Sequence, residues 1–498
     1  MRSLSQKAAL LIVANLLKYA VGFISPMLLV RLLNQEDYGT YQQLALITSI
    51  ATGIMVLGLP MSTYYFYNLV RDRPHGRPTL LAQTQIMLVI AGVVSGLVIY
   101  LFTPLIASKF SNQALQLYLP MTALYVALLI AGEHFMHVMI SQNRYAIAVF
   151  LETLETAVRV ALIVGVLALG FGVWGIVVGL LFYAGARLLV RSYWLWSGED
   201  SVLKARSSAA FPKEQLAYSL PLCASNLVGF LGNTLDRMIV AVAFTPIDYA
   251  IYSVGALEIP LDVIFQASVA NVLRASLPAL VQAGQFDEII RIWRAAVRKL
   301  ALIIVPSAVY LFVFADVFIT ALFTHKYQDS VTVFRVYVCL IPLHMVVVSV
   351  VPQVFGRTRL NLLAVVVATG TNVILSLALL KWLGFLGPAV AYVISSYVGS
   401  AIYFTVTKRL LKTTALELLP MGAIMRTTLA SGLALIPALI VAHLLPMGLL
   451  KLACTGIAFG IACPIAGWLC GALTREDAQT AMKYAKPLLA KVGIRGAT

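Results

Sequence analysis

Residues 80–106 read LLAQTQIMLVIAGVVSGLVIYLFTPLI, an apolar run without a single charged side chain. As an α-helix, such a run is long enough to cross the roughly 30 Å hydrocarbon core of a bilayer. Comparable runs recur along the chain, and they predict an all-α, polytopic protein with about fourteen transmembrane helices. The expected spans are residues 8–33, 40–66, 80–106, 115–141, 146–169, 174–196, 216–242, 250–275, 299–323, 330–353, 361–383, 386–407, 423–445 and 449–472.

The composition supports this class of protein. Of the 498 residues, 61% are hydrophobic and only 11% are charged. A soluble protein of this size needs far more charge to cover its surface. The segments between the apolar runs are too short for a further soluble domain, and almost nothing in them has the alternating pattern of a strand.

The formal net charge of +16 raises the question of a nucleic-acid partner. When successive connections are assigned to alternate sides, most Lys and Arg residues fall on the side of the N-terminus. This is the positive-inside distribution of a membrane protein, and it predicts that both termini are cytoplasmic. Orientation explains the basic charge, so we expect no nucleic-acid partner.

Two short sequence echoes predict an internal repeat. Residues 37–41 (DYGTY) are echoed by residues 248–252 (DYAIY), and residues 170–175 (GFGVWG) are echoed near residues 384–387 (GFLG). Both echoes have an offset close to 211 residues. Six crossings return the chain to its starting side, so the repeat is parallel, and substrates tend to bind between such halves. The predicted divisions are an N-terminal six-helix bundle (1–197), a cytoplasmic linker (198–215), a C-terminal six-helix bundle (216–412), two additional helices (413–473) and a cytoplasmic tail (474–498).

Four cations lie well inside apolar stretches, away from the ends of the predicted spans, namely Lys18, Arg159, Arg237 and Arg335. A charge at the membrane centre costs about 2.5–3.5 kcal/mol, so it normally faces a wet cavity or a partner. Lys18 and Arg237 belong to equivalent helices of the two halves, and we expect them to face each other across a central cleft. Snorkelling to the interface is the alternative for Lys18 and Arg335. Glu155 precedes Arg159 by four residues, which offers an intrahelical ion pair instead.

Carboxylates also lie at membrane depth. Glu258 and Asp262 are four residues apart and are expected on one helical face, and Asp236 precedes Arg237. Two like charges in a low dielectric disfavour double ionisation, as in a proton site that couples transport to an ion gradient. Balancing the charge of Arg237 is the other interpretation. Intramembrane carboxylates outnumber the cations, so the sign of the cavity stays open.

Other chemistry is weakly supported. Glu133, His134 and His137 provide only half of a metal site, and a polar lining is the simpler interpretation. The five cysteines lie inside spans without paired CxxC spacing, which favours neither a disulfide nor a zinc site. Residues 170–175 match GxGxxG literally but lack the strand and helix of a nucleotide fold. We therefore expect no cofactor, no metal and no enzymatic activity.

Five segments resemble the Wzx-type polysaccharide flippases. They are LKYAVGF at 17–23, VRLLN at 30–34 and DYGTY at 37–41, followed by NTLDR at 233–237 and DYAIY at 248–252. These flippases belong to the multidrug/oligosaccharidyl-lipid/polysaccharide exporter superfamily. The chain resembles this superfamily over essentially its whole length, because the predicted helices follow the same arrangement of six, six and two. Lys18 matches a position at which related flippases carry a cation.

The resemblance implies a function. Undecaprenyl-diphosphate-linked oligosaccharide repeat units would cross the bacterial or archaeal cytoplasmic (inner) membrane by alternating access, for surface polysaccharide biosynthesis. From their depth in the predicted spans, and not from the resemblance alone, we expect Lys18, Arg237, Arg159 and Arg335 to bind the diphosphate through charge-assisted hydrogen bonds. Implied partners are membrane lipids, a polysaccharide polymerase and glycosyltransferases. A cation-coupled multidrug antiporter and a lipid II flippase of the same superfamily are the alternatives. The short outer loops disfavour a membrane-embedded glycosyltransferase.

Overall fold

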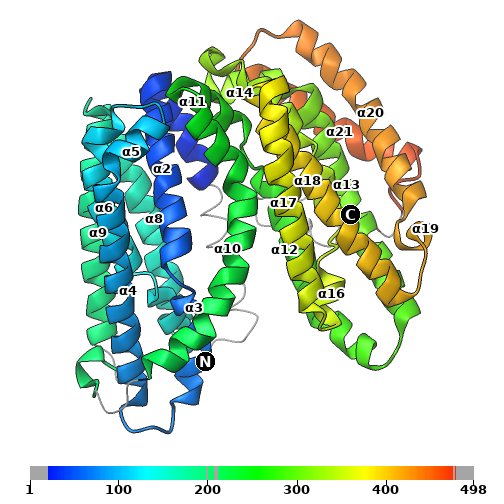
Figure 1. Cartoon of the computed structure of the whole chain (residues 1–498). Helices are drawn as coiled ribbons and strands as arrows, with labels where there is room; N and C mark the ends of the chain where they lie inside the picture. Colours follow the sequence, from blue (N-terminus) through cyan, green and yellow to red (C-terminus); the bar gives the residue numbers. More distant parts are fainter. Residues whose placement is uncertain (1–20, 198–199, 207–210, 475–476, 478–498) are drawn as a thin grey trace, which may run out of the picture. The chain divides into compact units, whose positions relative to one another are not determined.

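The computed structural model describes residues 21–197, 200–206, 211–474 and 477. These residues form helices joined by short turns, without a β-strand among them, which confirms the all-α prediction. They divide into two compact units (Figure 1). The first unit extends to Pro260 and includes Val365–Ser395, and the second comprises Leu261–Ala364 and the chain from Ser396 onward.

The first unit contains a helix over Val21–Leu32 and the elements that follow it up to the division at Pro260. They are α2 (Gln35–Met55), α3 (Leu59–Leu69), α4 (Gly76–Leu101), α5 (Thr103–Lys109), α6 (Leu115–Ala131), α7 (Phe135–Ser141), α8 (Tyr145–Ala168), α9 (Gly172–Trp196), η1 (Val202–Lys204), α10 (Pro212–Ala243) and α11 (Pro246–Gly255). Parts of α17 (Thr358–Leu383) and α18 (Leu386–Leu411) complete this unit.

The second unit holds the other parts of α17 and α18 and the remaining elements. They are α12 (Pro260–Gln282), α13 (Phe286–Val313), α14 (Ala315–Phe323), η3 (His325–Tyr327), α15 (Ser330–Val338), η4 (Ile341–Met345), α16 (Val350–Val354), α19 (Ala415–Leu418), α20 (Met421–Leu444) and α21 (Leu449–Leu469). Here the ring of Tyr310 of α13 packs against the ring of Phe459 of α21, with 5.1 Å between the ring centroids. The ring of Phe314 lies 5.0 Å from that of Tyr310. Its hydroxyl lies 3.0 Å from the hydroxyl of Thr455, which fixes α13 against α21.

Ten helices of the described chain are long and apolar enough to span a membrane. Four predicted spans are not among the ten: they correspond to Val21–Leu32, α8, α10 and the segment Ser330–Met345. In α8 the reason is visible, because Glu152, Glu155 and Arg159 lie near its middle. The protein is therefore a multi-pass membrane protein, and the count of fourteen stays a prediction.

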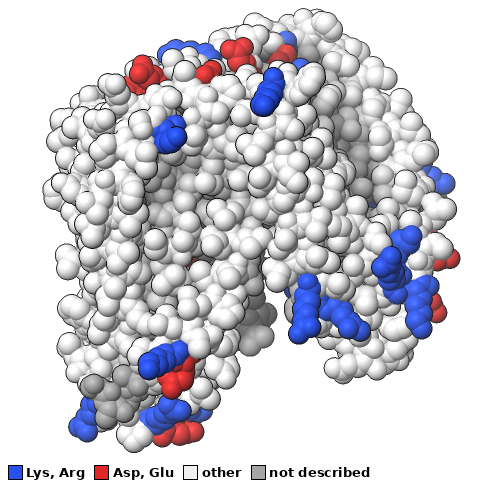
Figure 2. Space-filling view, in the orientation of Figure 1, with Lys and Arg blue, Asp and Glu red and all other residues white. Residues whose placement is uncertain are grey.

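Charged side chains on the visible surface gather near the helix ends (Figure 2). On the face seen in Figure 2, Lys, Arg, Asp and Glu gather toward the helix ends, and a broad uncharged band separates them. This distribution matches a chain whose central band lies in hydrocarbon and whose ends lie in water.

Glycine allows α4 and α6 to approach closely in the first unit. A Cβ on Gly92 would lie 2.5 Å from the carbonyl oxygen of Ala127, and one on Gly96 would lie 2.8 Å from that of Ala123. The two glycines are four residues apart and lie on one helical face. Small residues at this spacing bring helix backbones together within membranes.

The two DY motifs begin helices in the same way. Asn34 caps α2 by accepting a hydrogen bond from the backbone of Asp37, and Thr245 caps α11 by accepting one from Asp248. Each cap satisfies a backbone N–H that the first helical turn leaves without a partner. Gly39 brings the two helix starts together, because a Cβ there would lie 1.9 Å from the carbonyl oxygen of Pro246.

Candidate functional site

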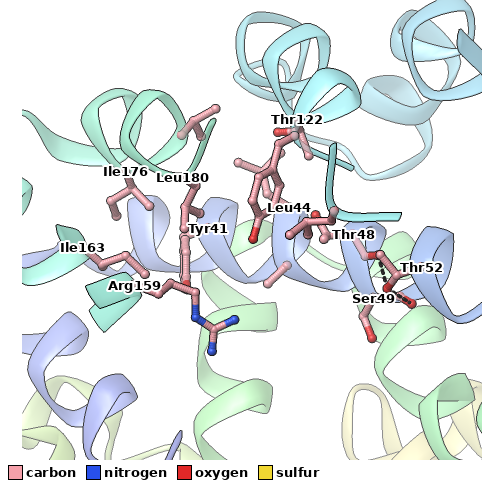
Figure 3. A pocket seen from close by; sticks show the side chains of 14 residues that line it. Tyr41, Leu44, Thr48, Ser49, Thr52, Thr122, Arg159, Ile163, Ile176 and Leu180 are labelled. Atoms are coloured by element: carbon pink, nitrogen blue, oxygen red, sulfur yellow. Dashed lines mark hydrogen bonds between the residues drawn. The ribbon is translucent and has the colours of Figure 1, made fainter. Parts of the chain in front are cut away.

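A cavity of about 300 Å³ opens inside the first unit, enclosed by α2, α6, α8 and α9 (Figure 3). One part of its wall is aliphatic, from residues of α8 and α9, and another part carries hydroxyl groups. Arg159 is the cation in the lining. The lining residues are Tyr41, Leu44, Ala45, Thr48, Ser49, Thr52, Thr122, Tyr125, Leu129, Arg159, Ile163, Ile176, Val177 and Leu180.

The hydroxyl groups come mainly from one face of α2. Thr48, Ser49 and Thr52 lie along this helix, and Figure 3 shows them on the side of the cavity away from Ile163 and Ile176. Spacings of three and four residues place side chains on the same helical face. The hydroxyl of Thr52 donates to the carbonyl oxygens of Thr48 and Ser49, at 2.9 and 3.1 Å. Its oxygen still has acceptor capacity for a ligand.

Arg159 reaches the cavity from α8. Figure 3 shows its side chain next to Tyr41, and it interacts electrostatically with both Tyr41 and Tyr125. Its side chain is exposed. Within the described residues, no carboxylate lies within 4.0 Å of its guanidinium. The cavity therefore presents a positive charge beside hydroxyl groups.

The predicted ion pair between Glu155 and Arg159 is wrong, because α9 supplies stronger partners for Glu155. Arg191 donates to both carboxylate oxygens of Glu155, at 2.9 and 2.6 Å, in a bidentate arrangement. Arg187 contacts the same carboxylate at 3.4 Å and donates to Glu133 at 3.0 Å. A bidentate pair is favoured over a flexible contact along one helix.

Arg187 and Arg191 form ion pairs that were not predicted from the sequence. Arg191 is only 3% exposed and donates at 2.8 Å to the carbonyl oxygen of Gly132. Arg187 donates at 3.2 Å to the carbonyl oxygen of Leu129. Their spacing of four residues along α9 was the available signal, because it places both guanidinium groups on one helical face. Two cations and two carboxylates cancel within this group, and Arg159 is not part of it.

A second charged cluster lies at α10 and α11, also in the first unit. The buried carboxylate of Asp236 accepts a hydrogen bond of 2.7 Å from the hydroxyl of Tyr252. Arg237 donates at 3.0 Å to the carbonyl oxygen of Ala256, and it lies 4.0 Å from the carboxylate of Glu258. Neither Asp236 nor Arg237 is among the residues that line the Arg159 cavity.

Glu258 and Asp262 do not share a helical face. Helix α11 ends at Gly255 and α12 begins at Pro260, so Glu258 lies in the extended connection between them. The prediction of one continuous helix is therefore wrong. The Glu258 side chain is 71% exposed and faces Arg237, whereas Asp262 is fully buried and accepts a hydrogen bond of 2.9 Å from Ser307.

Of the other predicted cations in the described chain, Arg237 and Arg335 are not among the residues that line the cavity. Arg335, on α15 of the second unit, donates at 3.2 Å to the carbonyl oxygen of Phe312, and this contact is exposed to solvent or lipid. Lys18 lies outside the described residues, so its predicted position opposite Arg237 stays a prediction. Roles in substrate binding for Lys18, Arg159, Arg237 and Arg335 likewise stay predictions.

Comparison with known proteins places this arrangement in a family. The model of the family described as "Polysaccharide biosynthesis protein" matches residues 28–332, which is more than half of the chain. No curated protein matches the sequence. The family match confirms the resemblance to polysaccharide exporters.

Solved structures share the fold. Lipid II flippase MurJ in an inward closed conformation is 14% identical with a TM-score of 0.71, covering 92% of this chain and 97% of that chain. An inward-facing multidrug resistance MATE family transporter of the MOP superfamily is 18% identical with a TM-score of 0.61, covering 81% and 96%. A MATE transporter from Vibrio cholerae is 12% identical with a TM-score of 0.52, covering 83% and 97%. The chain thus belongs to the polysaccharide biosynthesis protein family, as a multi-pass membrane protein whose fold is that of the lipid II flippase and the MATE transporters.

Proposed function

We propose that the protein is a flippase that moves polyprenyl-diphosphate-linked oligosaccharide repeat units across the cytoplasmic membrane. Undecaprenyl diphosphate is the carrier expected in a bacterial host. The observation that carries the proposal is Arg159, a cation without a carboxylate within 4.0 Å in the described chain, inside a hydroxyl-lined cavity at membrane depth. The family match to polysaccharide biosynthesis supports the saccharide part of the substrate.

The chemistry of the cavity suits this substrate. A diphosphate loses its hydration on entering hydrocarbon, and a buried anion must regain hydrogen bonds and a counter-charge. Arg159 supplies both through its planar set of donors. The hydroxyl groups of Thr48, Ser49 and Thr52 offer partners to sugar hydroxyls. An aliphatic wall is formed by residues of α8 and α9, namely Ile163, Ile176, Val177 and Leu180.

Transport by alternating access would use both halves of the predicted repeat. In this proposal the parallel repeat (residues 1–197 and 216–412) forms the moving bundles, and Lys18, Arg237 and Arg335 contribute further contacts to the substrate. Asp236, Glu258 and Asp262 balance charge or couple an ion. A polysaccharide polymerase and glycosyltransferases would act on the same lipid-linked units before and after translocation.

The proposal is tested with purified full-length protein in proteoliposomes. Three cargoes are compared: a fluorescent polyprenyl-diphosphate-linked oligosaccharide, lipid II and a cationic drug. We expect protein-dependent movement of the oligosaccharide lipid that exceeds that of lipid II by about tenfold or more, a discrimination reachable with one or two well-placed polar contacts. Faster movement of lipid II would support a peptidoglycan role instead, and drug movement alone would support an antiporter.

A further inference from the structure

A second pocket, of about 350 Å³, lies at the opposite end of α8 from the turn into α9. It is formed where the α3–α4 and α7–α8 turns meet the segment after α9, at the end of the first unit where Figure 2 shows blue and red side chains together. Every lining residue carries a polar side-chain group. They are Tyr67, Asn68, Arg71, Arg77, Ser141, Gln142, Asn143, Arg144 and Asp200.

The single carboxylate of this pocket is already neutralised. Asp200 lies 3.9 Å from the guanidinium of Arg77 and accepts a short hydrogen bond from the hydroxyl of Tyr67. Arg77 in turn donates at 3.3 Å to the carbonyl oxygen of Tyr67 and lies 4.4 Å from the centre of its ring. These three residues form one wall in which the charges of Arg77 and Asp200 cancel.

The other two arginines of the lining, Arg71 and Arg144, do not take part in this pair. Neither has a carboxylate within 4.0 Å in the described part of the chain. Asn143 has φ 58°, and this left-handed turn sets Arg144 directly before α8, at the pocket. Two guanidinium groups that share a pocket repel each other and raise the local positive potential, which an anion relieves.

A buried hydrogen-bond acceptor, on Gln142, restricts the chemical class of the ligand further. The side-chain oxygen of Gln142 is buried and accepts no hydrogen bond from any described residue. An acceptor in that state costs free energy unless a ligand donates to it. The pocket therefore offers two cationic donors for phosphate oxygens and one acceptor for a hydroxyl group.

We propose that this pocket is a second anion site, which binds a phosphate ester whose headgroup also carries a hydroxyl. A diphosphate matches the two free arginines best, because bidentate guanidinium contacts suit phosphate oxygens. The ligand comes either from an anionic bilayer lipid such as phosphatidylglycerol or from a diphosphate-linked saccharide. The site shares no lining residue with the Arg159 cavity, and it does not depend on translocation activity.

The test uses full-length protein in phosphatidylcholine nanodiscs, in an Arg159→Gln background so that the cavity does not contribute. Inorganic pyrophosphate binding is measured by calorimetry for three forms: the background, Arg71→Gln/Arg144→Gln, and the control Arg73→Gln/Arg206→Gln. The control removes the same charge from residues that do not line the pocket. We expect the first pair to weaken binding by about tenfold or more and the control by less than about twofold.

The source of the ligand is decided by a second arm. Native mass spectrometry compares retention of phosphatidylglycerol with that of phosphatidylcholine in the same variants. Retention of phosphatidylglycerol that the first pair abolishes assigns a bilayer lipid, and a response to pyrophosphate alone assigns a diphosphate-linked ligand. Gln142→Leu should weaken phosphatidylglycerol retention but leave pyrophosphate binding unchanged.

Equal behaviour of the two variant pairs with both probes overturns the proposal. Should the double variant fail to fold, Arg71→Gln alone keeps the test valid, because this exposed side chain makes no ion pair within the described residues. A loss of pyrophosphate binding here says nothing against flipping, since translocation is measured separately.

Discussion

At the scale of single residues, four charged side chains of the first unit form a neutral group beside Arg159. Arg187 and Arg191 are matched by Glu133 and Glu155 through contacts of 2.6–3.4 Å. Such a pair in a low dielectric is tolerable only when each partner is present and hydrogen-bonded. The neutral group holds α6, α8 and α9 together, and it leaves the charge of Arg159 for a ligand.

Removing Glu155 should therefore destabilise the fold strongly. Glu155→Gln leaves Arg191, whose side chain is 4% exposed, without its carboxylate. Breaking a buried ion pair from one side costs about 3–5 kcal/mol. We expect a decrease of that order in the free energy of unfolding, measured by denaturant titration in detergent.

The matched control for this prediction is Glu288→Gln. Glu288 also forms a bidentate pair, with Arg291 at 2.8 and 2.6 Å, but Arg291 is 78% exposed. An exposed pair contributes little to stability, because water screens its charges, so this variant should leave the free energy of unfolding almost unchanged. Similar losses in the two variants would contradict the neutral-group interpretation.

Asp262 is the carboxylate best placed for ion coupling. It is buried in the second unit, accepts from Ser307 at 2.9 Å, and has no Lys or Arg nitrogen within 4.0 Å among the described residues. We expect Asp262→Asn to abolish the acceleration of transport by an imposed pH gradient in proteoliposomes, whereas the exposed Asp287→Asn retains it. An unchanged gradient response in Asp262→Asn would rule out this role.

At the scale of helices, spacing along one helix did not predict which contacts form between helices. Glu155 and Arg159 lie four residues apart on α8. The carboxylate of Glu155 nevertheless binds Arg191 of α9, because Arg191 donates two parallel hydrogen bonds to it. No pattern along α8 alone contains that information. The spacing of Arg187 and Arg191 along α9 could have suggested two guanidinium groups on one helical face.

The break between α11 and α12 shows a second limit of the sequence. Pro260 opens α12, and the residue before a proline is biased toward extended backbone. Hydropathy alone carried the predicted helix through residues 250–275, so Glu258 and Asp262 were placed on one face. The break moves Glu258 next to Arg237, at 4.0 Å.

The close approach of α4 and α6 is testable through Gly92. Gly92→Ala would place a Cβ 2.5 Å from a backbone oxygen, which neither helix can avoid without moving. Overpacking of this kind costs about 1–3 kcal/mol. We expect a lower thermal unfolding temperature in detergent.

Gly432→Ala is the control for Gly92→Ala. Gly432 lies within α20, and no atom lies within 4 Å of the position of its Cβ. Alanine is favoured over glycine in a helix by about 1 kcal/mol, so this variant should be neutral or stabilising. A loss of stability equal to that of Gly92→Ala would contradict the packing argument.

At the scale of the whole molecule, the all-α class and the family were predictable because long apolar runs and short motifs carry them. The equivalent caps Asn34 and Thr245 support the proposed repeat, since both DY motifs start a helix with an aspartate at the same position. The cavity itself was not predictable, because its lining comes from four helices whose contacts no single segment determines.

The proposed orientation predicts which connections face the cytoplasm. Single cysteines are introduced in a cysteine-free background at Ser111, in the α5–α6 turn, and at Gln285, in the α12–α13 turn. A membrane-impermeant maleimide should label Ser111→Cys in intact cells and label Gln285→Cys only after permeabilisation. The reverse pattern would invert the topology, and with it the direction of the proposed transport.

The most direct test of the account is the initial rate of oligosaccharide-lipid translocation in proteoliposomes for Arg159→Gln against Lys109→Gln. Both changes remove one positive charge from the first unit, but only Arg159 lines the cavity. A lost charge-assisted contact is worth about 1.5–3 kcal/mol, so Arg159→Gln should slow translocation by about tenfold or more while Lys109→Gln stays near the wild-type rate. A wild-type rate in Arg159→Gln, with folded protein, would contradict the claim that this cavity binds the diphosphate.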